Sequence, residues 1–232
     1  MSRAHTLFET EKLEAWAGEK PLIRGVSFSL LRGETVVITG ENGAGKSTIG
    51  RAIMGDKRLT IAADTMMLDG ESILELEAAA RARKGLFYAP QEIPTIDGVS
   101  YREMLRAALE VRGKKMRGME FKQSLAECLA KVGVGPFMAE REIGSKLSGG
   151  EKKKMEVVEL LMLRPKVAIL DEIDSGLDKK STERIAQILE EAQKEWGLGL
   201  IIITHNQKIT EKLRIGDNIR IEKGQMRREY SE

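Results

Sequence analysis

Strongly apolar runs alternate with helical patterns along most of the chain. The apolar runs are ETVVIT at 34–39, KVAILDE at 166–172 and GLIIIT at 199–204. Apolar strands of this kind are typical of a parallel sheet that is buried on both faces. The alternation therefore predicts an α/β fold, with a mostly parallel sheet and helices on both sides of it.

Weaker patterns complete the expected fold. Shorter strands are expected at 6–16, 26–31, 65–70, 85–89 and 218–224. Helices are expected at about 74–84, from 147 to about 163, and at 179–195, with a short helix before the last strand. Residues 100–142 are charged, show helical spacing and have no strand pattern, so we interpret them as a helical insertion.

Composition excludes several classes of function. The 232 residues carry 38 Lys and Arg against 36 Asp and Glu, and a net charge of +2 predicts no nucleic-acid partner. The basic clusters Lys152–Lys154 and Arg227–Arg228 are interpreted as solvated faces. One cysteine, Cys128, permits neither an intramolecular disulfide nor a cysteine-rich cluster. No signal-peptide or bilayer-length apolar segment is present, so we expect a cytoplasmic chain without direct membrane insertion.

A glycine-rich segment joins the strand at 34–39 to a helix. It fits the phosphate-binding pattern G-x-x-x-x-G-K-[ST] and comprises Gly40, Glu41, Asn42, Gly43, Ala44, Gly45, Lys46, Ser47 and the following Thr48. In such a loop the backbone N–H groups and the helix N-terminus bind phosphates. Lys46 is expected to reach the β- and γ-phosphates and Ser47 to bind Mg²⁺. A chance glycine turn is the alternative, but the strand before the loop and the helix after it favour ATP and magnesium binding.

Two adjacent carboxylates end the strand at 166–172. Asp171 is expected to hold the magnesium ion, directly or through a water molecule. Glu172, one residue further, is expected to polarise the attacking water. A surface carboxylate at a strand end is the alternative for Glu172, and the parallel sheet argues against it by placing Asp171 beside the phosphate loop.

The segment LSGGE at 147–151 begins another helix. Ser148, Gly149 and Gly150 form a second anion site at a helix N-terminus, although a simple N-cap is the ordinary explanation of such residues. Because the helical insertion lies between the two anion sites, we do not expect them to converge on one phosphate in a monomer. A head-to-tail dimer would place each LSGG segment against the nucleotide held by the other copy.

The ordered set GENGAGKS, Gln91, LSGGE, AILDE, SGLD and His205 resembles the nucleotide-binding domain of ATP-binding-cassette (ABC) ATPases. This resemblance covers essentially the whole chain and implies a P-loop NTPase with N-terminal antiparallel strands. It also implies one domain over 1–232, in which 1–98 and 143–232 form the catalytic core and about 99–142 the helical subdomain.

The resemblance further implies roles for individual residues. An ATP-dependent homodimer is expected, with His205 contacting the γ-phosphate, where a lone histidine would otherwise be a core residue. Gln91 is expected to act in catalysis by joining the metal site to the helical subdomain. Trp16 is a candidate for stacking on adenine, with a plain surface or core role as the alternative.

Within this superfamily the string LDEIDSGLD is similar to the SufC branch, the ATPases of Suf iron–sulfur cluster assembly. KLSGGEKKKMEVVELLML, RARKGLFYAPQEIPTIDGVS and THNQKI are also similar to that branch, whereas Lys179-Lys180-Ser181 depart from it. This likeness implies a scaffold partner similar to SufB and SufD. The alternative is the ATP-binding subunit of a membrane transporter.

Ile173 and Asp174 stand where most members of the superfamily have Pro-Thr. Asp174 would bring a third carboxylate close to Asp171 and Glu172, and the lysine run at 152–154 could supply a compensating cation. From this we expect Glu172 to be poorly positioned in the isolated subunit and to be aligned when a partner drives dimerisation.

Overall fold

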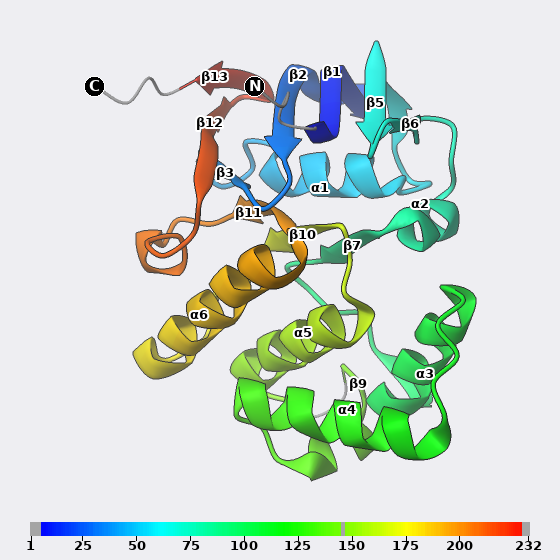
Figure 1. Cartoon of the computed structure of the whole chain (residues 1–232). Helices are drawn as coiled ribbons and strands as arrows, with labels where there is room; N and C mark the ends of the chain where they lie inside the picture. The colour runs from blue at the N-terminus through cyan, green and yellow to red at the C-terminus, as the bar shows by residue number, and fades with distance from the viewer. Residues whose placement is uncertain (1–5, 145–146, 229–232) are drawn as a thin grey trace, which may run out of the picture.

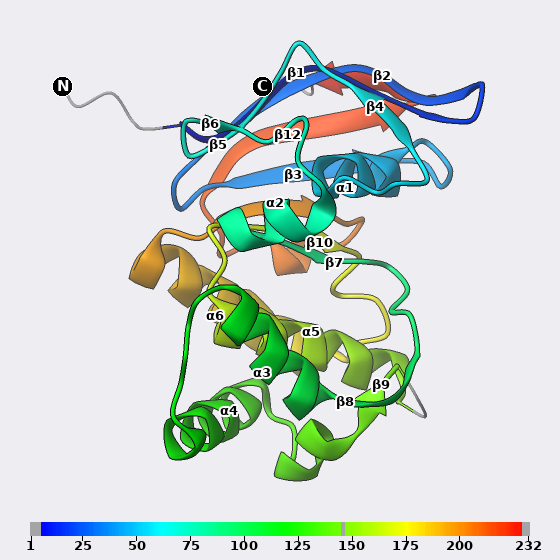
Figure 2. The same ribbon diagram turned by 90° about the vertical axis from the view of Figure 1, so that its right-hand side faces the viewer.

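The computed structural model describes residues 6–144 and 147–228. Its centre is a parallel sheet that crosses the molecule (Figures 1 and 2). Neighbouring strands of this sheet lie in the order β7 (Leu86–Ala89), β10 (Val167–Asp171), β11 (Gly199–Ile203), β3 (Thr35–Gly40) and β12 (Ile215–Glu222). The parallel α/β core predicted from the apolar runs is confirmed.

The N-terminal strands form an antiparallel layer over the core. Its elements are β1 (Thr6–Ala17), β2 (Lys20–Leu31), β4 (Thr60–Ala62), β5 (Thr65–Leu68) and β6 (Glu71–Ser72), and β13 (Gln225–Arg228) joins it to β12. The predicted strand at 26–31 is too short, because pairing with β1 continues back to Lys20 opposite Ala17. The first part of β2 is defined by backbone pairing with β1 across the turn at Gly18 and Glu19. Its side chains do not alternate regularly between buried and exposed, so the sequence pattern does not show it as a strand.

Helices cover both faces of the central sheet. On one side lie α1 (Lys46–Met54) and α2 (Ala78–Lys84); on the other lie α5 (Gly149–Leu163) and α6 (Lys179–Trp196) (Figure 2). Successive strand side chains point to opposite faces. Accordingly, Ile169 packs in the core that contains α1, whereas Ala168 and Leu170 pack in the core that contains α5 and α6. Because each core packs against the same strands, α1 and α5 are held in fixed positions on opposite faces of the sheet.

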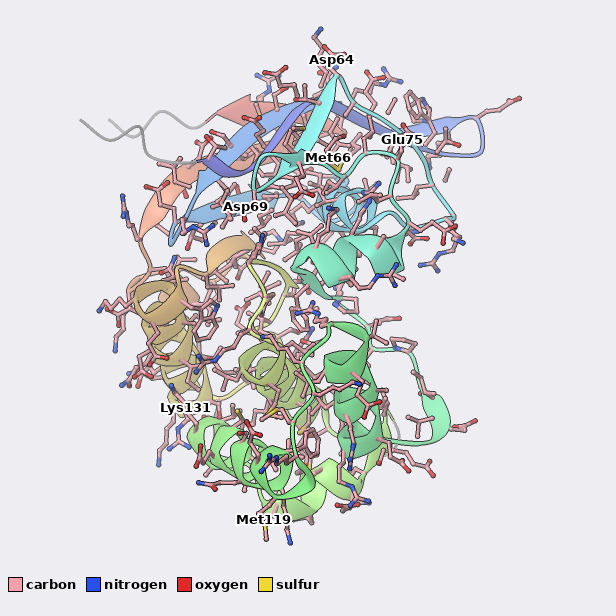
Figure 3. The ribbon with its side chains drawn as sticks, turned by 45° about the vertical axis from the view of Figure 1, so that its right-hand side comes forward. Asp64, Met66, Asp69, Glu75, Met119 and Lys131 are labelled. Carbon is pink, nitrogen blue, oxygen red and sulfur yellow. The ribbon has the colours of Figure 1, made fainter. Side chains whose placement is uncertain are left out.

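The helical insertion contains α3 (Tyr101–Val111), α4 (Gly118–Val132) and the short 3₁₀ helix η1 (Pro136–Glu140). Residues at helical spacing, such as Leu105, Leu109 and Leu125, are buried in it, whereas Met119 is 78% exposed and points outward (Figure 3). Its ends are joined by two antiparallel strands, β8 (Ile96–Ser100) and β9 (Glu142–Ile143), which the sequence did not predict. These strands are very short and largely exposed, and so lack an apolar period.

The C-terminal region has the expected short helix and a strand close to 218–224, but a turn at Lys223 and Gly224 ends that strand, and the further strand β13 was not predicted. The 3₁₀ helix η2 (Gln207–Ile209) follows β11 and precedes β12. Over residues 6–144 and 147–228, no helix combines the length and the apolarity that a membrane span requires.

Candidate active site

The glycine-rich loop after β3 forms the wall of a cavity of about 460 Å³ at the carboxyl edge of the sheet. The lining residues are Leu22, Asn42, Gly43, Gly45, Lys46, Ser47, Thr48, Gln91 and Glu172. Most of the predicted phosphate loop, the predicted glutamine and the predicted glutamate therefore meet at one cavity. Parallel strands end at this edge, which is where open α/β sheets bind ligands.

Two glycines are required by the shape of this loop. Gly40 has φ +140°, and a Cβ there would lie 2.2 Å from the carbonyl oxygen of Ile221. Gly45 has φ +105°, and a Cβ there would lie 2.9 Å from the carbonyl oxygen of Leu22. Side chains at these positions would collide with neighbouring backbone, so the loop can pack closely only with glycine.

Lys46 begins α1 and is 6% exposed. Its Nζ donates hydrogen bonds to the carbonyl oxygens of Gly40 (2.8 Å) and Glu41 (2.9 Å), and so curls the loop around the ammonium group. The helix N-cap is Gly45, which provides no side-chain acceptor for the first N–H groups of α1. These N–H groups and the positive end of the helix are suited to an anion.

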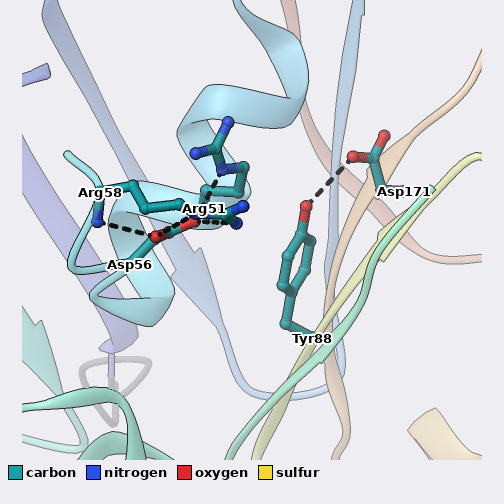
Figure 4. A network of polar contacts seen from close by, with 5 residues as sticks. All are labelled: Arg51, Asp56, Arg58, Tyr88 and Asp171. Carbon is teal, nitrogen blue, oxygen red and sulfur yellow. Dashed lines mark hydrogen bonds and ion pairs between the residues drawn. The ribbon is translucent and has the colours of Figure 1, made fainter. Parts of the chain in front are cut away.

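Asp171 ends β10 with its side chain almost fully buried, at 1% exposure. Burial raises the pKa of this carboxyl, and the nearby Ser47 hydroxyl and the Tyr88 phenol oppose the shift. The Tyr88 hydroxyl donates to Oδ2 at 3.3 Å (Figure 4). Among the described residues, Oδ1 has no hydrogen-bond partner. A buried carboxylate oxygen without a partner, beside a serine hydroxyl, fits a hard cation such as Mg²⁺.

Glu172 has an unusual backbone conformation, with φ +53°. Its N–H donates to the carbonyl oxygen of Ile203 (2.9 Å), and Gln91 Nε2 donates to its Oε2 (2.8 Å). For a residue other than glycine, a left-handed conformation costs about 1 kcal/mol or more and is held by surrounding contacts. The glutamate is therefore placed at the cavity by a strained backbone and by the predicted glutamine.

The two residues after Glu172 have distinct environments. Ile173 is fully buried in the core that contains α5 and α6. Asp174 Oδ1 accepts a hydrogen bond from Thr204 Oγ1 at 2.9 Å. Thr204 directly precedes His205, whose side chain is exposed. This bond ties the loop after β10 to the loop after β11, which carries the predicted histidine.

Lys153 corrects the expectation that the lysine run at 152–154 is a solvated face. It is 5% exposed, and its Nζ donates to the carbonyl oxygens of Pro90 (2.9 Å) and Asp171 (3.3 Å) and pairs with Glu156 at 3.1 Å. The cation expected near the carboxylates is therefore present, but it contacts the backbone of Asp171. Lys153 lies four residues before the buried Val157, and residues at this spacing share one face of a helix. The sequence therefore contained a signal that Lys153 faces inward.

The LSGGE segment at 147–151, called the signature segment below, lies outside this cavity. Ser148 caps α5, and Glu151 completes a capping box by accepting hydrogen bonds from the Ser148 backbone N–H (2.9 Å) and hydroxyl (2.8 Å). Gly150 packs against the SGLD loop, since a Cβ there would lie 2.9 Å from the Gly176 carbonyl oxygen. Neither Ser148, Gly149 nor Gly150 lines the cavity of the phosphate loop. This placement agrees with the expectation that the two anion sites do not converge within one chain.

Trp16 does not line the cavity either. It lies half-buried in β1, paired with Pro21 of β2 and Thr60 of β4. Leu22 of β2 is the apolar side chain that does line the cavity. Sequence reasoning did not single out Leu22, because it precedes the strand predicted at 26–31 and belongs to no motif.

Sequence comparisons identify related proteins. The family model described as ABC transporter matches residues 23–175. A probable ABC transporter ATP-binding protein of Streptococcus pyogenes serotype M3 is 40% identical over 208 residues, covering 88% of this chain and 80% of the relative. Vegetative protein 296 of Bacillus subtilis is 37% identical over 82% of this chain and 74% of its own length. The probable ATP-dependent transporter ycf16 of Pyropia yezoensis is 36% identical over 90% and 84%.

Solved structures share the fold. The dimeric structure of MJ0796, a bacterial ABC transporter cassette, superposes with a TM-score of 0.83 at 22% identity, covering 97% of this chain and 98% of that one. A post-hydrolysis structure of MJ0796 bound to ADP and Pi gives a TM-score of 0.82 at 21% identity, with the same coverage of both chains. At this identity the likeness concerns the fold of the cassette.

Proposed function

The chain belongs to the ABC transporter family of ATP-binding cassettes and is an ATPase, and from the similarity of its LDEIDSGLD string to the SufC branch we propose that it drives a Suf-type iron–sulfur cluster assembly scaffold. The observation that carries the proposal is the hydrogen bond between Asp174 and Thr204. It gives the IDSGLD sequence, which is similar to the SufC branch, a defined structural role. Ile173 fills the core and Asp174 joins the loops that carry Glu172 and His205.

We propose that the cavity binds ATP through the phosphate loop. The phosphates would contact the backbone of the loop from Gly40 to Thr48 and the ammonium group of Lys46. Magnesium would be held by Ser47, Asp171 and Gln91, and when bound it would neutralise charge on the phosphates. Support comes from the uncapped α1 N-terminus and from the unpartnered Asp171 Oδ1.

Hydrolysis would use residues on three different strand ends. Glu172 would accept a proton from the attacking water, since a carboxylate near the γ-phosphate can act as a general base. His205 would contact the γ-phosphate, and Gln91 would position Glu172 through the bond seen at 2.8 Å. Ser148, Gly149 and Gly150 would come from a second copy of the chain. Trp16 is proposed as the adenine contact only if ligand binding moves β1, because it lies outside the cavity.

We further propose that the isolated subunit is a slow ATPase. Glu172 is held at φ +53° and accepts a hydrogen bond from Gln91. Lys153 binds the carbonyl oxygens of Pro90 and Asp171, the residues directly before Gln91 and Glu172. A partner that moves the Gln91 segment would move Glu172 with it through this bond and align the carboxylate with the attacking water. Steady-state ATPase measurements on the purified chain, with and without a Suf-type scaffold complex, test this. Stimulation of about tenfold or more is expected, whereas rapid turnover without the scaffold would refute it.

A membrane transporter is the second candidate, because relatives carry names such as probable ABC transporter ATP-binding protein. Affinity purification of the tagged chain from its source cells separates the two. The soluble fraction should yield scaffold proteins of the assembly system. Recovery of a membrane permease from the detergent-solubilised fraction, with no soluble scaffold, would favour transport instead.

A further inference from the structure

Tyr88 lies beside the metal-site carboxylate although no sequence motif includes it. It is on β7, directly opposite Ile169 of β10 in the parallel register. Asp171 is two residues beyond Ile169, so Tyr88 and Asp171 lie on the same face of the sheet as diagonal neighbours. The phenol therefore reaches the carboxylate, with its hydroxyl 3.3 Å from Oδ2 (Figure 4).

The position of the Tyr88 ring is set by α1. At Gly50 an added Cβ would lie 2.9 Å from Tyr88 Cε2 and 3.0 Å from Ile169 Cγ2. The absence of a side chain at Gly50 thus makes room for the aromatic ring between the helix and the sheet. Gly50 is three residues after Ser47, so the same helical turn that carries the serine hydroxyl also packs against Tyr88.

The two oxygens of Asp171 differ in their contacts. Oδ2 accepts the hydrogen bond from Tyr88, whereas Oδ1 has no hydrogen-bond partner in the part of the chain that the structure describes. A buried carboxylate with one oxygen held by a neutral donor cannot rotate freely, because rotation would break that bond. Its second oxygen stays available for a cation.

We propose that Tyr88 is a positioning residue for the magnesium site. The Tyr88 hydroxyl holds Oδ2 of Asp171, so that Oδ1 is left for the metal ion. This role is independent of the partner on which the ATPase acts. It rests on the assignment of Asp171 as a magnesium ligand, which is part of the proposed function. A group that orients a metal ligand typically changes metal affinity by tenfold or more when it is removed.

The test compares nucleotide affinity with and without magnesium. A fluorescent ATP analogue is titrated into the full chain in EDTA and again in excess Mg²⁺, and the ratio of the two Kd values measures how strongly metal supports binding. Tyr88→Phe keeps the ring and loses only the hydroxyl. We expect its affinity in EDTA to match the wild type and its magnesium-dependent ratio to fall about tenfold.

Two further variants make the result decisive. Tyr101→Phe removes another buried tyrosine hydroxyl, on α3 in the helical insertion, and should leave the ratio unchanged. Asp171→Asn should abolish most of the magnesium effect, and thermal unfolding in EDTA confirms that each variant is folded. If Asp171→Asn lowers the ratio and Tyr88→Phe does not, the positioning role is overturned. If neither lowers it, the metal assignment itself is overturned.

Discussion

The phosphate loop and the signature segment are both turns that lead into a helix, yet their helix N-termini differ. At α1 the N-cap is Gly45, with no side-chain acceptor for the first N–H groups. At α5 the N-cap is Ser148, and Glu151 supplies a carboxylate that accepts from its backbone and hydroxyl. The first terminus is open to a phosphate, whereas at the second a carboxylate of the same chain binds the N-cap residue. The comparison indicates that the phosphate loop is preformed for an anion, whereas the signature segment is stabilised by a contact within its own chain.

The largest expected effect comes from the preformed site. Lys46→Ala removes the ammonium group that the loop surrounds, and with it the charge expected to neutralise the transferred phosphate. We expect ATPase activity to fall about a hundredfold or more, measured by phosphate release. Lys57→Ala removes an exposed lysine near the end of the same helix and should leave activity unchanged. Equal activities in the two variants would contradict the role of the phosphate loop.

The signature segment should matter only when two copies meet. Among the described residues outside its own helical turn and its chain neighbours, an added Cβ at Gly149 meets no atom within 4 Å. Gly149→Ala should therefore leave the thermal stability and ATP affinity of the monomer unchanged. In a Glu172→Gln background that preserves ATP, we expect it to weaken the ATP-dependent dimer about tenfold, because an extra methyl group at a close interface costs about 1–3 kcal/mol.

Analytical ultracentrifugation with ATP measures this dimer. Gly118→Ala is the matched control, since a Cβ at that position on α4 likewise has no neighbouring atom within 4 Å in the described part of the chain outside its own helical turn. It should change neither dimerisation nor stability. A dimer that tolerates Gly149→Ala as well as Gly118→Ala would show that the signature segment does not approach the nucleotide of the other copy.

The Glu151 carboxylate at the start of α5 contributes to the stability of the folded chain. Glu151→Ala removes the acceptor for the backbone N–H and hydroxyl of Ser148, and we expect a loss of about 0.5–1 kcal/mol in the free energy of unfolding. Urea denaturation measures this value. Glu151→Gln keeps an acceptor at the same position and should lose less. Similar losses in both variants would mean that the charge, and not the hydrogen bond, stabilises α5.

The smallest expected effect is a pH dependence of the stability that the Glu151 carboxylate contributes. Hydrogen bonds from Ser148 lower the pKa of Glu151 in the folded chain below its ordinary value of 4.5. Since the unfolded chain binds the proton more tightly, the contribution is present above about pH 4.5 and is lost as the pH falls through the lowered folded pKa. The stability difference between wild type and Glu151→Gln should therefore shrink between pH 5 and pH 3. A difference that does not vary with pH would contradict this.

Much of the active site could be predicted because its signals are local. The strand, the glycine loop and the helix around Lys46 form a continuous pattern, and the glycine positions follow from the close backbone packing of the loop. The end of β10 likewise identifies Asp171 and Glu172 as neighbours at a strand end. In contrast, Lys153 was expected on a solvated face, because the lysine run was interpreted by its charge and not by its spacing from the apolar residues of the same helix.

The sequence by itself determined the alternation of core strands and helices, the phosphate loop and the candidate carboxylates, since these depend on residues near one another along the chain. Only the tertiary structure decided which distant groups meet. The bonds from Tyr88 to Asp171, from Gln91 to Glu172 and from Thr204 to Asp174 join separate strand ends. Sheet register and helix packing fix these distances, and a linear pattern does not contain them. The tertiary structure likewise decided that Glu172 is held at positive φ.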